Sequence, residues 1–169
     1  MKTKILRKSI LQSVTFALIF TLGMATTFAQ QKYQIAGNQT LDQIDTKQGR
    51  LDDALGKTML LMMFEGVNSN TGNTEFMDGA QVIGMVSSES DGTISPFQGY
   101  FRIEKEGDMV YLKIEGTTIL SDMSVEASFS IINGTGRYEN IRGAGTYKGG
   151  YMSENIVATE WAGEYWIEK

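Results

Sequence analysis

The sequence contains no cysteine and no histidine, and its 169 residues include a single proline. Without cysteine the chain cannot form a disulfide, so its folded domain depends on its hydrophobic core alone. Without histidine it has no Ser-His-Asp triad, no histidine zinc site and no histidine general base. We therefore expect no metal site and no cofactor. Any catalysis would have to use carboxylates, tyrosine, lysine, arginine or bound water.

The first thirty residues differ in composition from the rest. Residues 2–8 carry four basic side chains and no acid, and residues 10–24 are mostly apolar. Small residues at Thr27 and Ala29 fit the pocket of a signal peptidase. The pattern predicts a signal peptide at residues 1–29, cleaved after Ala29, and an exported bacterial protein of the periplasm or the extracellular space. The apolar stretch is shorter than the ~20 residues of a membrane-spanning helix, so we expect no membrane span after cleavage.

Acidic side chains exceed basic ones in the remainder. Four of the 15 Lys and Arg precede residue 30, which leaves 11 against 20 Asp and Glu. Nucleic-acid binding requires a basic surface that displaces counterions, so we expect no nucleic-acid partner. The acid excess is typical of a soluble protein.

Residues 30–56 are polar and contain three glycines. Leu51 and Leu55 are four residues apart, which would place them on one face of a short helix over residues 45–55. An ordered coil is the alternative. We predict an N-terminal lead-in at residues 30–56, followed by the folded domain at residues 57–169.

From residue 57 onward the sequence has the pattern of β-strands. Apolar and polar residues alternate in the segments 97–104, 110–115 and 125–131, which indicates an antiparallel meander with one apolar face. Further strands are predicted at residues 58–64, 80–87, 142–148, 156–161 and 163–167, which makes seven or eight in all.

A flat sheet of this many strands would leave long unpaired edges, and closure into a barrel removes them. Glycines at positions 84, 99, 143 and 145 would permit tight coiling. The sequence therefore predicts an all-β fold, a closed antiparallel eight-stranded barrel. A two-sheet sandwich is the alternative.

The segment 132–149 contains Asn133-Gly-Thr-Gly-Arg-Tyr138 and then a glycine-rich strand. It resembles the glycine hairpin of the allene oxide cyclase and dirigent barrel superfamily, although Asn133 replaces the first glycine of the usual pair. Residues 107–117 and 161–165 look like exported bacterial relatives of that superfamily, most of them without an assigned function. The resemblance implies a calycin-like barrel with an apolar lumen and a structural glycine corner. The glycines of this corner are Gly134, Gly136, Gly143 and Gly145.

The side chains that we expect to line the lumen are apolar and come from the predicted strands. They are Met59, Leu61, Met63, Phe101, Ile103, Leu112, Ile114 and Phe129. Eight methionines follow residue 29. Methionine fills gaps in a core or lines an adaptable binding surface, so these residues either complete the core or receive an apolar guest.

Glu65 is the candidate for a catalytic residue. It ends an apolar strand and shares a strand face with Leu61 and Met63. A carboxyl group at the mouth of an apolar cavity is desolvated and can act as an acid or a base. A solvated strand end is the alternative interpretation.

Three functional hypotheses follow from these patterns. The first is a barrel without catalysis that binds a small apolar ligand or has a structural or interaction role. The second is a cofactor-free cyclase or isomerase, or a dirigent-like guide, which uses cavity shape and a carboxylate. The third is a homo-oligomer, because residues 58–64 have two apolar faces that would suit an interface.

Overall fold

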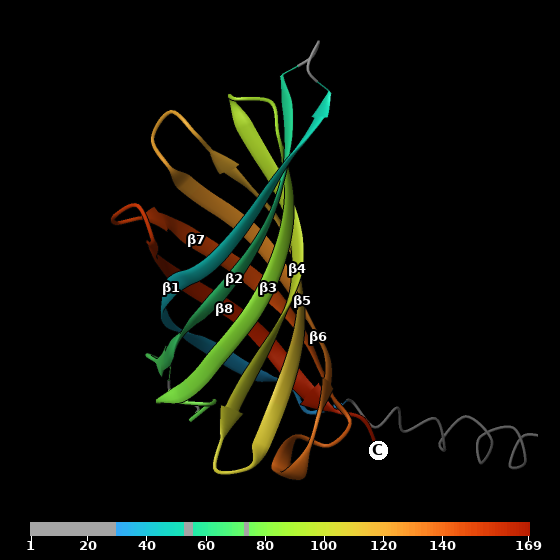
Figure 1. Cartoon of the computed structure of the whole chain (residues 1–169). Helices are drawn as coiled ribbons and strands as arrows, with labels where there is room; N and C mark the ends of the chain where they lie inside the picture. The colour runs from blue at the N-terminus through green and yellow to red at the C-terminus, as the bar shows by residue number, and fades with distance from the viewer. Residues whose placement is uncertain (1–29, 53–55, 73–74) are drawn as a thin grey trace, which may run out of the picture.

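The computed structural model describes residues 30–52, 56–72 and 75–169 (Figure 1). These residues form eight β-strands and one short 3-10 helix, η1. The elements are β1 (Tyr33–Asp52), β2 (Lys57–Asn70), β3 (Ala80–Ser90), β4 (Ile94–Lys105), β5 (Asp108–Ile119), β6 (Ser124–Gly134), η1 (Gly136–Tyr138), β7 (Ile141–Tyr151) and β8 (Ile156–Ile167). The predicted signal peptide, residues 1–29, lies outside the described residues. No helix in the described ranges has the length and apolar character needed to span a bilayer.

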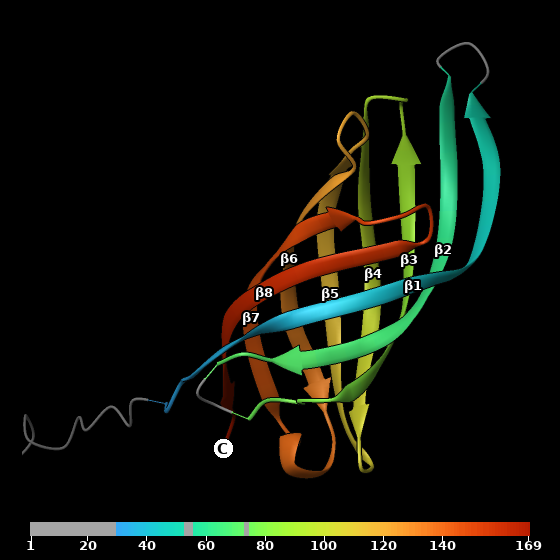
Figure 2. The same cartoon turned by 90° about the vertical axis from the view of Figure 1, so that its left-hand side faces the viewer.

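The strands form one closed antiparallel barrel in sequence order. Each strand pairs with the next, and β1 pairs with β8 from Tyr33 opposite Tyr165 to Asp42 opposite Ile156. Figure 2 shows β1 and β8 side by side at this seam. The predicted closed eight-stranded barrel is therefore confirmed, and the sandwich alternative is wrong.

The alternation in β4, β5 and β6 places the apolar side chains inside the barrel, as predicted. Phe101 and Ile103 on β4 are buried, whereas Tyr100 between Gly99 and Phe101 is exposed. Leu112 on β5 and Phe129 on β6 are likewise buried. The two sides of each strand therefore differ in burial as their period of two requires.

The predicted lead-in at residues 30–56 is wrong, because Tyr33–Asp52 is the 20-residue strand β1. Ile35 and Leu41 face inward and are buried. Pairing with β2 and β8 supplies the hydrogen bonds that a polar strand with few apolar residues needs. Beyond Asp42 the pairing with β8 ends, and β1 and β2 continue as a ribbon that projects at the top of Figure 1.

The C-terminal region also differs from the prediction. The two segments predicted as separate strands, 156–161 and 163–167, form the single strand β8. Gly163 lies within this strand, opposite Gly145 of β7. A glycine in a strand permits close approach of neighbours without ending the strand.

One end of the barrel is closed by packed side chains. Phe76 and Met77, from the connection between β2 and β3, are almost fully buried there. The ring of Phe76 lies 5.6 Å from that of Tyr138 in η1 and 6.0 Å from that of Trp161. We call this the closed end, and the end with the β3–β4, β5–β6 and β7–β8 turns the open end.

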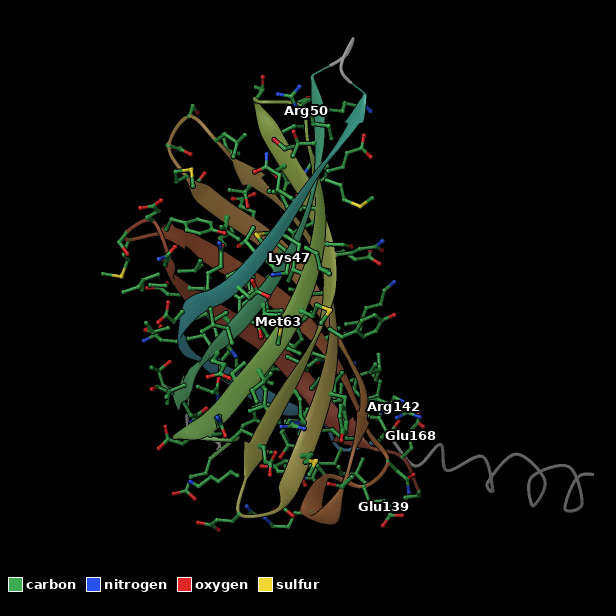
Figure 3. The ribbon with its side chains drawn as sticks, in the orientation of Figure 1. Lys47, Arg50, Met63, Glu139, Arg142 and Glu168 are labelled. Carbon is green, nitrogen blue, oxygen red and sulfur yellow. The ribbon has the colours of Figure 1, made fainter. Side chains whose placement is uncertain are left out.

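Charged residues mark the two ends in Figure 3. Glu139, Arg142 and Glu168 lie near the closed end, and Arg50 lies near the projecting tip of β1. Arg142 pairs with Glu168 at 3.4 Å, which ties β7 to the residue after β8. Because Tyr33 at the start of β1 pairs with Tyr165 near the end of β8, both the start of β1 and the end of β8 lie at the closed end.

The predicted glycine corner forms the connection from β6 to β7. Gly136 has a φ of +60° and opens η1, and a Cβ atom there would collide with the carboxylate of Asp108. Gly134 ends β6, where a Cβ would lie 2.4 Å from the carbonyl oxygen of Tyr138. Gly143 and Gly145 follow inside β7.

Candidate functional site

A cavity of about 60 Å³ lies inside the barrel toward its open end. All eight strands contribute to its wall. The lining residues are Gln39, Leu41, Met62, Phe64, Val86, Phe97, Phe101, Ile114, Thr118, Val125, Ala127, Tyr147, Tyr151, Val157 and Thr159. Most of these side chains are apolar, so the site is suited to an apolar group.

Aromatic rings form part of the wall, and one glycine fixes the position of a ring. Phe64 and Phe101 stack with their ring centroids 6.4 Å apart. Gly84 lies directly opposite Phe101 in the β3–β4 pair. A Cβ atom at Gly84 would lie 2.3 Å from Cε1 of Phe101, so the ring occupies the space that a side chain would fill. The width of the cavity on this side depends on that glycine.

Three buried polar side chains lie together on one side of the cavity, and we call them the polar group: Gln39, Tyr147 and Thr159. Gln39 on β1 is directly opposite Thr159 on β8. Gly149 of β7 is the partner of Thr159 on its other side, and Tyr147 is two residues away on the same strand face. Their side chains are at most 8% exposed.

Hydrogen bonds hold two members of the polar group in place. Gln39 Nε2 donates to Asn68 Oδ1 at 3.4 Å, and Asn68 Nδ2 donates to the carbonyl oxygen of Met77 at 2.9 Å. Burial raises the pKa of Tyr147 well above its ordinary value of 10.0, and a hydrogen bond with Gln39 offsets this only in part. Tyr147 is therefore a neutral phenol near pH 7.

Thr159 differs from the other two members. Its Oγ1 atom is buried and has no hydrogen-bond partner among the residues that the structure describes. A buried hydroxyl group left unpaired costs about 1–3 kcal/mol. The polar group therefore contains one hydroxyl group that has no partner among the described residues and belongs to a residue of the cavity wall.

Comparison with solved structures identifies the architecture. The structure of the pterocarpan synthase dirigent protein PsPTS1 matches with a TM-score of 0.50 and 16% sequence identity, over 84% of this chain and 99% of that chain. The chain has the barrel fold of the dirigent proteins. The pterocarpan synthase dirigent protein GePTS1 is similar at 14% identity, over 86% of this chain and 96% of that chain, with a TM-score of 0.49. No protein-family model matches the chain, and no curated protein matches its sequence.

At 16% identity, the likeness to PsPTS1 extends to the dirigent barrel fold alone. The expected link to allene oxide cyclases and the bacterial origin stay predictions. The functional residues of this dirigent-type barrel are therefore inferred from the residues that line its own cavity.

Glu65 does not enter the cavity of this dirigent-type barrel. It is exposed, whereas its neighbours Phe64 and Met62 face inward and are buried. Within the described ranges, no Asp, Glu, Lys or Arg is among the cavity-lining residues. The proposed catalytic placement of Glu65 is therefore wrong. Its side chain is solvated, as the alternative interpretation expected, but it lies within β2 (Lys57–Asn70) and not at the end of a strand.

The residues expected in the lumen fall into three groups. Phe101 and Ile114 line the cavity. Three others belong to the buried core of the barrel without lining the cavity: Ile103, Leu112 and Phe129. Three lie on the outer face of β2: Met59, Leu61 and Met63.

The placement of Met59, Leu61 and Met63 in the lumen is therefore wrong. Met59 is 48% exposed and Leu61 is 41% exposed. Figure 3 labels Met63 on this strand, where it is partly exposed. Residues 58–64 are apolar on both faces, so the alternation of side chains could not show which face is inside.

The sequence did not point to the polar group. Tyr147 is an even number of positions from Gly143 and Gly145, and Thr159 is two positions from Val157 and from Trp161, so each shares a strand face with these residues. The alternation of side chains along β7 and β8 would have placed Tyr147 and Thr159 in the interior of the barrel. Gln39 had no such signal, because β1 was not predicted as a strand.

Exposed apolar side chains surround the open end, and we call them the apolar rim. They come from β1, the starts of β4 and β8, the end of β5 and two turns. They are Ile44, Ile94, Ile119, Met123, Met152 and Ile156, each at least 38% exposed. The apolar rim therefore lies at the same end of the barrel as the cavity. Ile94, Ile119 and Ile156 are on the outer face of their strands, because their neighbours Ser95, Thr118 and Val157 are buried.

Proposed function

We propose that this barrel binds a small apolar molecule in its cavity and does not transform it. The observation that carries the proposal is the apolar cavity, which lies toward the end that bears the apolar rim. Transfer of apolar surface from water into such a site contributes about 25 cal/mol per Å². The rim offers further apolar surface to any part of the molecule that remains outside.

The volume limits the size of the guest. A cavity of about 60 Å³ is several times the ~10–15 Å³ that one water molecule needs. It is smaller than the ~300–1,000 Å³ typical of sites for drug-sized ligands. The expected guest is therefore a short chain, or one end of a larger molecule whose remainder lies outside the cavity, because a whole ring such as benzene occupies a cavity of about 150 Å³.

The chemistry of the wall favours binding over catalysis. A cyclase or dirigent-like guide that acts through a carboxylate would need an acidic side chain in the cavity. Glu65 was the candidate, and it is exposed on the outside of the barrel. Tyr147 and Tyr151 line the cavity, and burial raises the pKa of both hydroxyl groups, which disfavours proton release. Guidance of a reactive molecule by cavity shape alone is compatible with the same site.

A variant that fills the cavity tests this proposal. Ala127 lines the cavity, and Ala127→Leu places a larger apolar side chain in the space that a guest would use. We expect methylcyclohexane, titrated by ligand-observed saturation-transfer NMR, to bind the wild type and to bind Ala127→Leu at least about tenfold more weakly.

Ala144→Leu is the matched control, because Ala144 is exposed on the outside of β7. It should bind methylcyclohexane as the wild type does. Absence of saturation transfer with the wild type, or equal affinity of the wild type and Ala127→Leu, would contradict the proposal.

Self-association is a second candidate role, and the outer face of β2, β3 and β4 favours it. Met63 is opposite Met85, and Met85 is opposite Tyr100, so the three form a row across the strands. Met59 and Leu61 extend this row along β2. We call these five residues the outer patch. Such a patch would suit burial against a second copy of the chain.

A further inference from the structure

We infer that the cavity takes a neutral apolar molecule that carries one hydrogen-bonding oxygen, an alcohol or a ketone. This inference rests on the binding function proposed above and names the class of ligand. The observation behind it is the polar group, which lies on one side of a mostly apolar wall whose other hydroxyl-bearing residues are Thr118 and Tyr151.

The Thr159 hydroxyl group provides the contact for that oxygen. Its Oγ1 atom is buried without a partner among the described residues, although Thr159 belongs to the cavity wall. On β7 its neighbour is Gly149, which has no side chain to offer. A hydroxyl group both donates and accepts, so it can bond to a ketone oxygen or to an alcohol.

Gln39 and Tyr147 define the polar side of the cavity before any ligand arrives. Gln39 is joined to Asn68, and Asn68 is joined to the backbone at Met77, inside the closed end. Tyr147 bonds to Gln39 in turn. Because these hydrogen bonds already hold the Gln39 and Tyr147 side chains in place, neither side chain has to rearrange when a polar ligand atom binds, which favours binding.

Charge determines which oxygen-bearing molecules are accepted. A carboxylate in this cavity would be desolvated beside a wall that contains no Lys or Arg within the described residues. The chain itself has a net charge of −5, which further disfavours an anion. An alcohol or a ketone needs only the single hydrogen bond that Thr159 can supply.

The test measures how Thr159→Val changes the affinity for three ligands of similar size: methylcyclohexane, cyclohexanone and cyclohexanecarboxylate. Valine keeps the shape of threonine and removes the hydroxyl group. By the same NMR titration, we expect Thr159→Val to bind cyclohexanone about tenfold more weakly and to bind methylcyclohexane within about twofold of the wild type. The carboxylate should not bind either protein near pH 7.

Thr146→Val makes the same chemical change on the outside of β7, where Thr146 is exposed, and should leave all affinities unchanged. Retained binding of methylcyclohexane shows that Thr159→Val is folded. If Thr159→Val binds cyclohexanone as the wild type does, or if the carboxylate binds as tightly as the ketone, this inference is overturned and the binding function stands. If neither methylcyclohexane nor cyclohexanone binds the wild type, the binding function fails, and the inference fails with it.

Discussion

Gly145 and Gly163 face each other across β7 and β8, and one aromatic ring uses the space that they leave. A Cβ atom at Gly145 would lie 2.4 Å from Cζ of Phe129, and one at Gly163 would lie 3.0 Å from it. The Phe129 ring in turn lies 5.1 Å from that of Tyr147, a member of the polar group. These glycines therefore help to position a residue of the cavity wall.

We predict that Gly145→Ala destabilises the barrel by about 1–3 kcal/mol, because the added methyl group overpacks the interior. It would also lie 2.3 Å from the backbone oxygen of Ala162, which cannot move without disturbing the β7–β8 pairing. Urea unfolding followed by tryptophan fluorescence measures the change.

Gly49→Ala is the control, because nothing lies within 4 Å of a Cβ at that position in β1. Its free energy of unfolding should equal or slightly exceed that of the wild type, since alanine restricts the unfolded chain. Equal stability of the Gly145→Ala and Gly49→Ala variants would show that the interior accommodates the methyl group.

At the scale of elements, the connection from β6 to β7 depends on an ion pair. The Arg137 side chain donates to Asp108 Oδ2, and the Arg137 backbone N–H donates to Asp108 Oδ1 at 3.1 Å. These bonds hold the pKa of Asp108 below its ordinary value of 3.8. The carboxylate at the start of β5 thus fastens η1 to the closed end.

The lowered pKa of Asp108 predicts a pH dependence. The ionised Asp108 carboxylate stabilises the folded state in full when the pH is above its ordinary pKa of 3.8. This stabilisation is lost as the pH falls through the lowered pKa, because the folded state must then take up a proton. We therefore expect Asp108→Asn to unfold at a lower temperature than the wild type near neutral pH. The difference should disappear in acid.

Circular dichroism melts from neutral to acidic pH test this expectation. Glu139→Gln removes a charge from an exposed position beside the same corner and serves as the control. A difference between Asp108→Asn and the wild type that stays constant down to the lowest pH would rule out the ion pair as its source.

How far the sequence predicts each element depends on how different its two faces are. Residues 97–104 and 125–131 alternate clearly, so the inward positions of Phe101 and Phe129 could be predicted. Residues 58–64 are apolar on both sides, because the outward face carries the outer patch, and pattern alone could not orient them. In β1 the inward residues include Gly37 and Gln39, so the strand lacks an apolar alternation and depends on its partners for stability.

The candidate site was predictable only in outline for the same reason. The alternating segments predicted strands with one apolar face, and the family resemblance implied an apolar lumen. Phe101 and Ile114 were placed correctly in its wall. The polar group could not be predicted as a unit, because its members come from β1, β7 and β8. Only closure of the barrel brings Gln39 opposite Thr159, and that pairing joins residues more than a hundred positions apart.

At the scale of the whole molecule, the outer patch predicts self-association. We expect light scattering after size exclusion to give a mass above that of one chain for the wild type. Leu61→Lys combined with Met85→Lys should reduce the mass to that of a single chain, because charged side chains disfavour burial of the patch.

Ser128→Lys combined with Thr146→Lys adds the same charge to an exposed pair on β6 and β7 and should leave the assembly unchanged. A wild-type protein that elutes as a single chain at every concentration would exclude this role. Ligand binding would be unaffected by that result, because the cavity is lined from within one barrel.

The seam between β1 and β8 also determines how the molecule can be handled. Because the described chain starts and finishes on neighbouring strands at the closed end, a peptide linker could join residue 30 to residue 169 without crossing the lumen. New termini could then be opened in the β3–β4 turn, giving a circular permutant with the same strand order around the barrel. An affinity handle attached after residue 169 would likewise tether each molecule to a sensor surface with the open end of its barrel facing the solution.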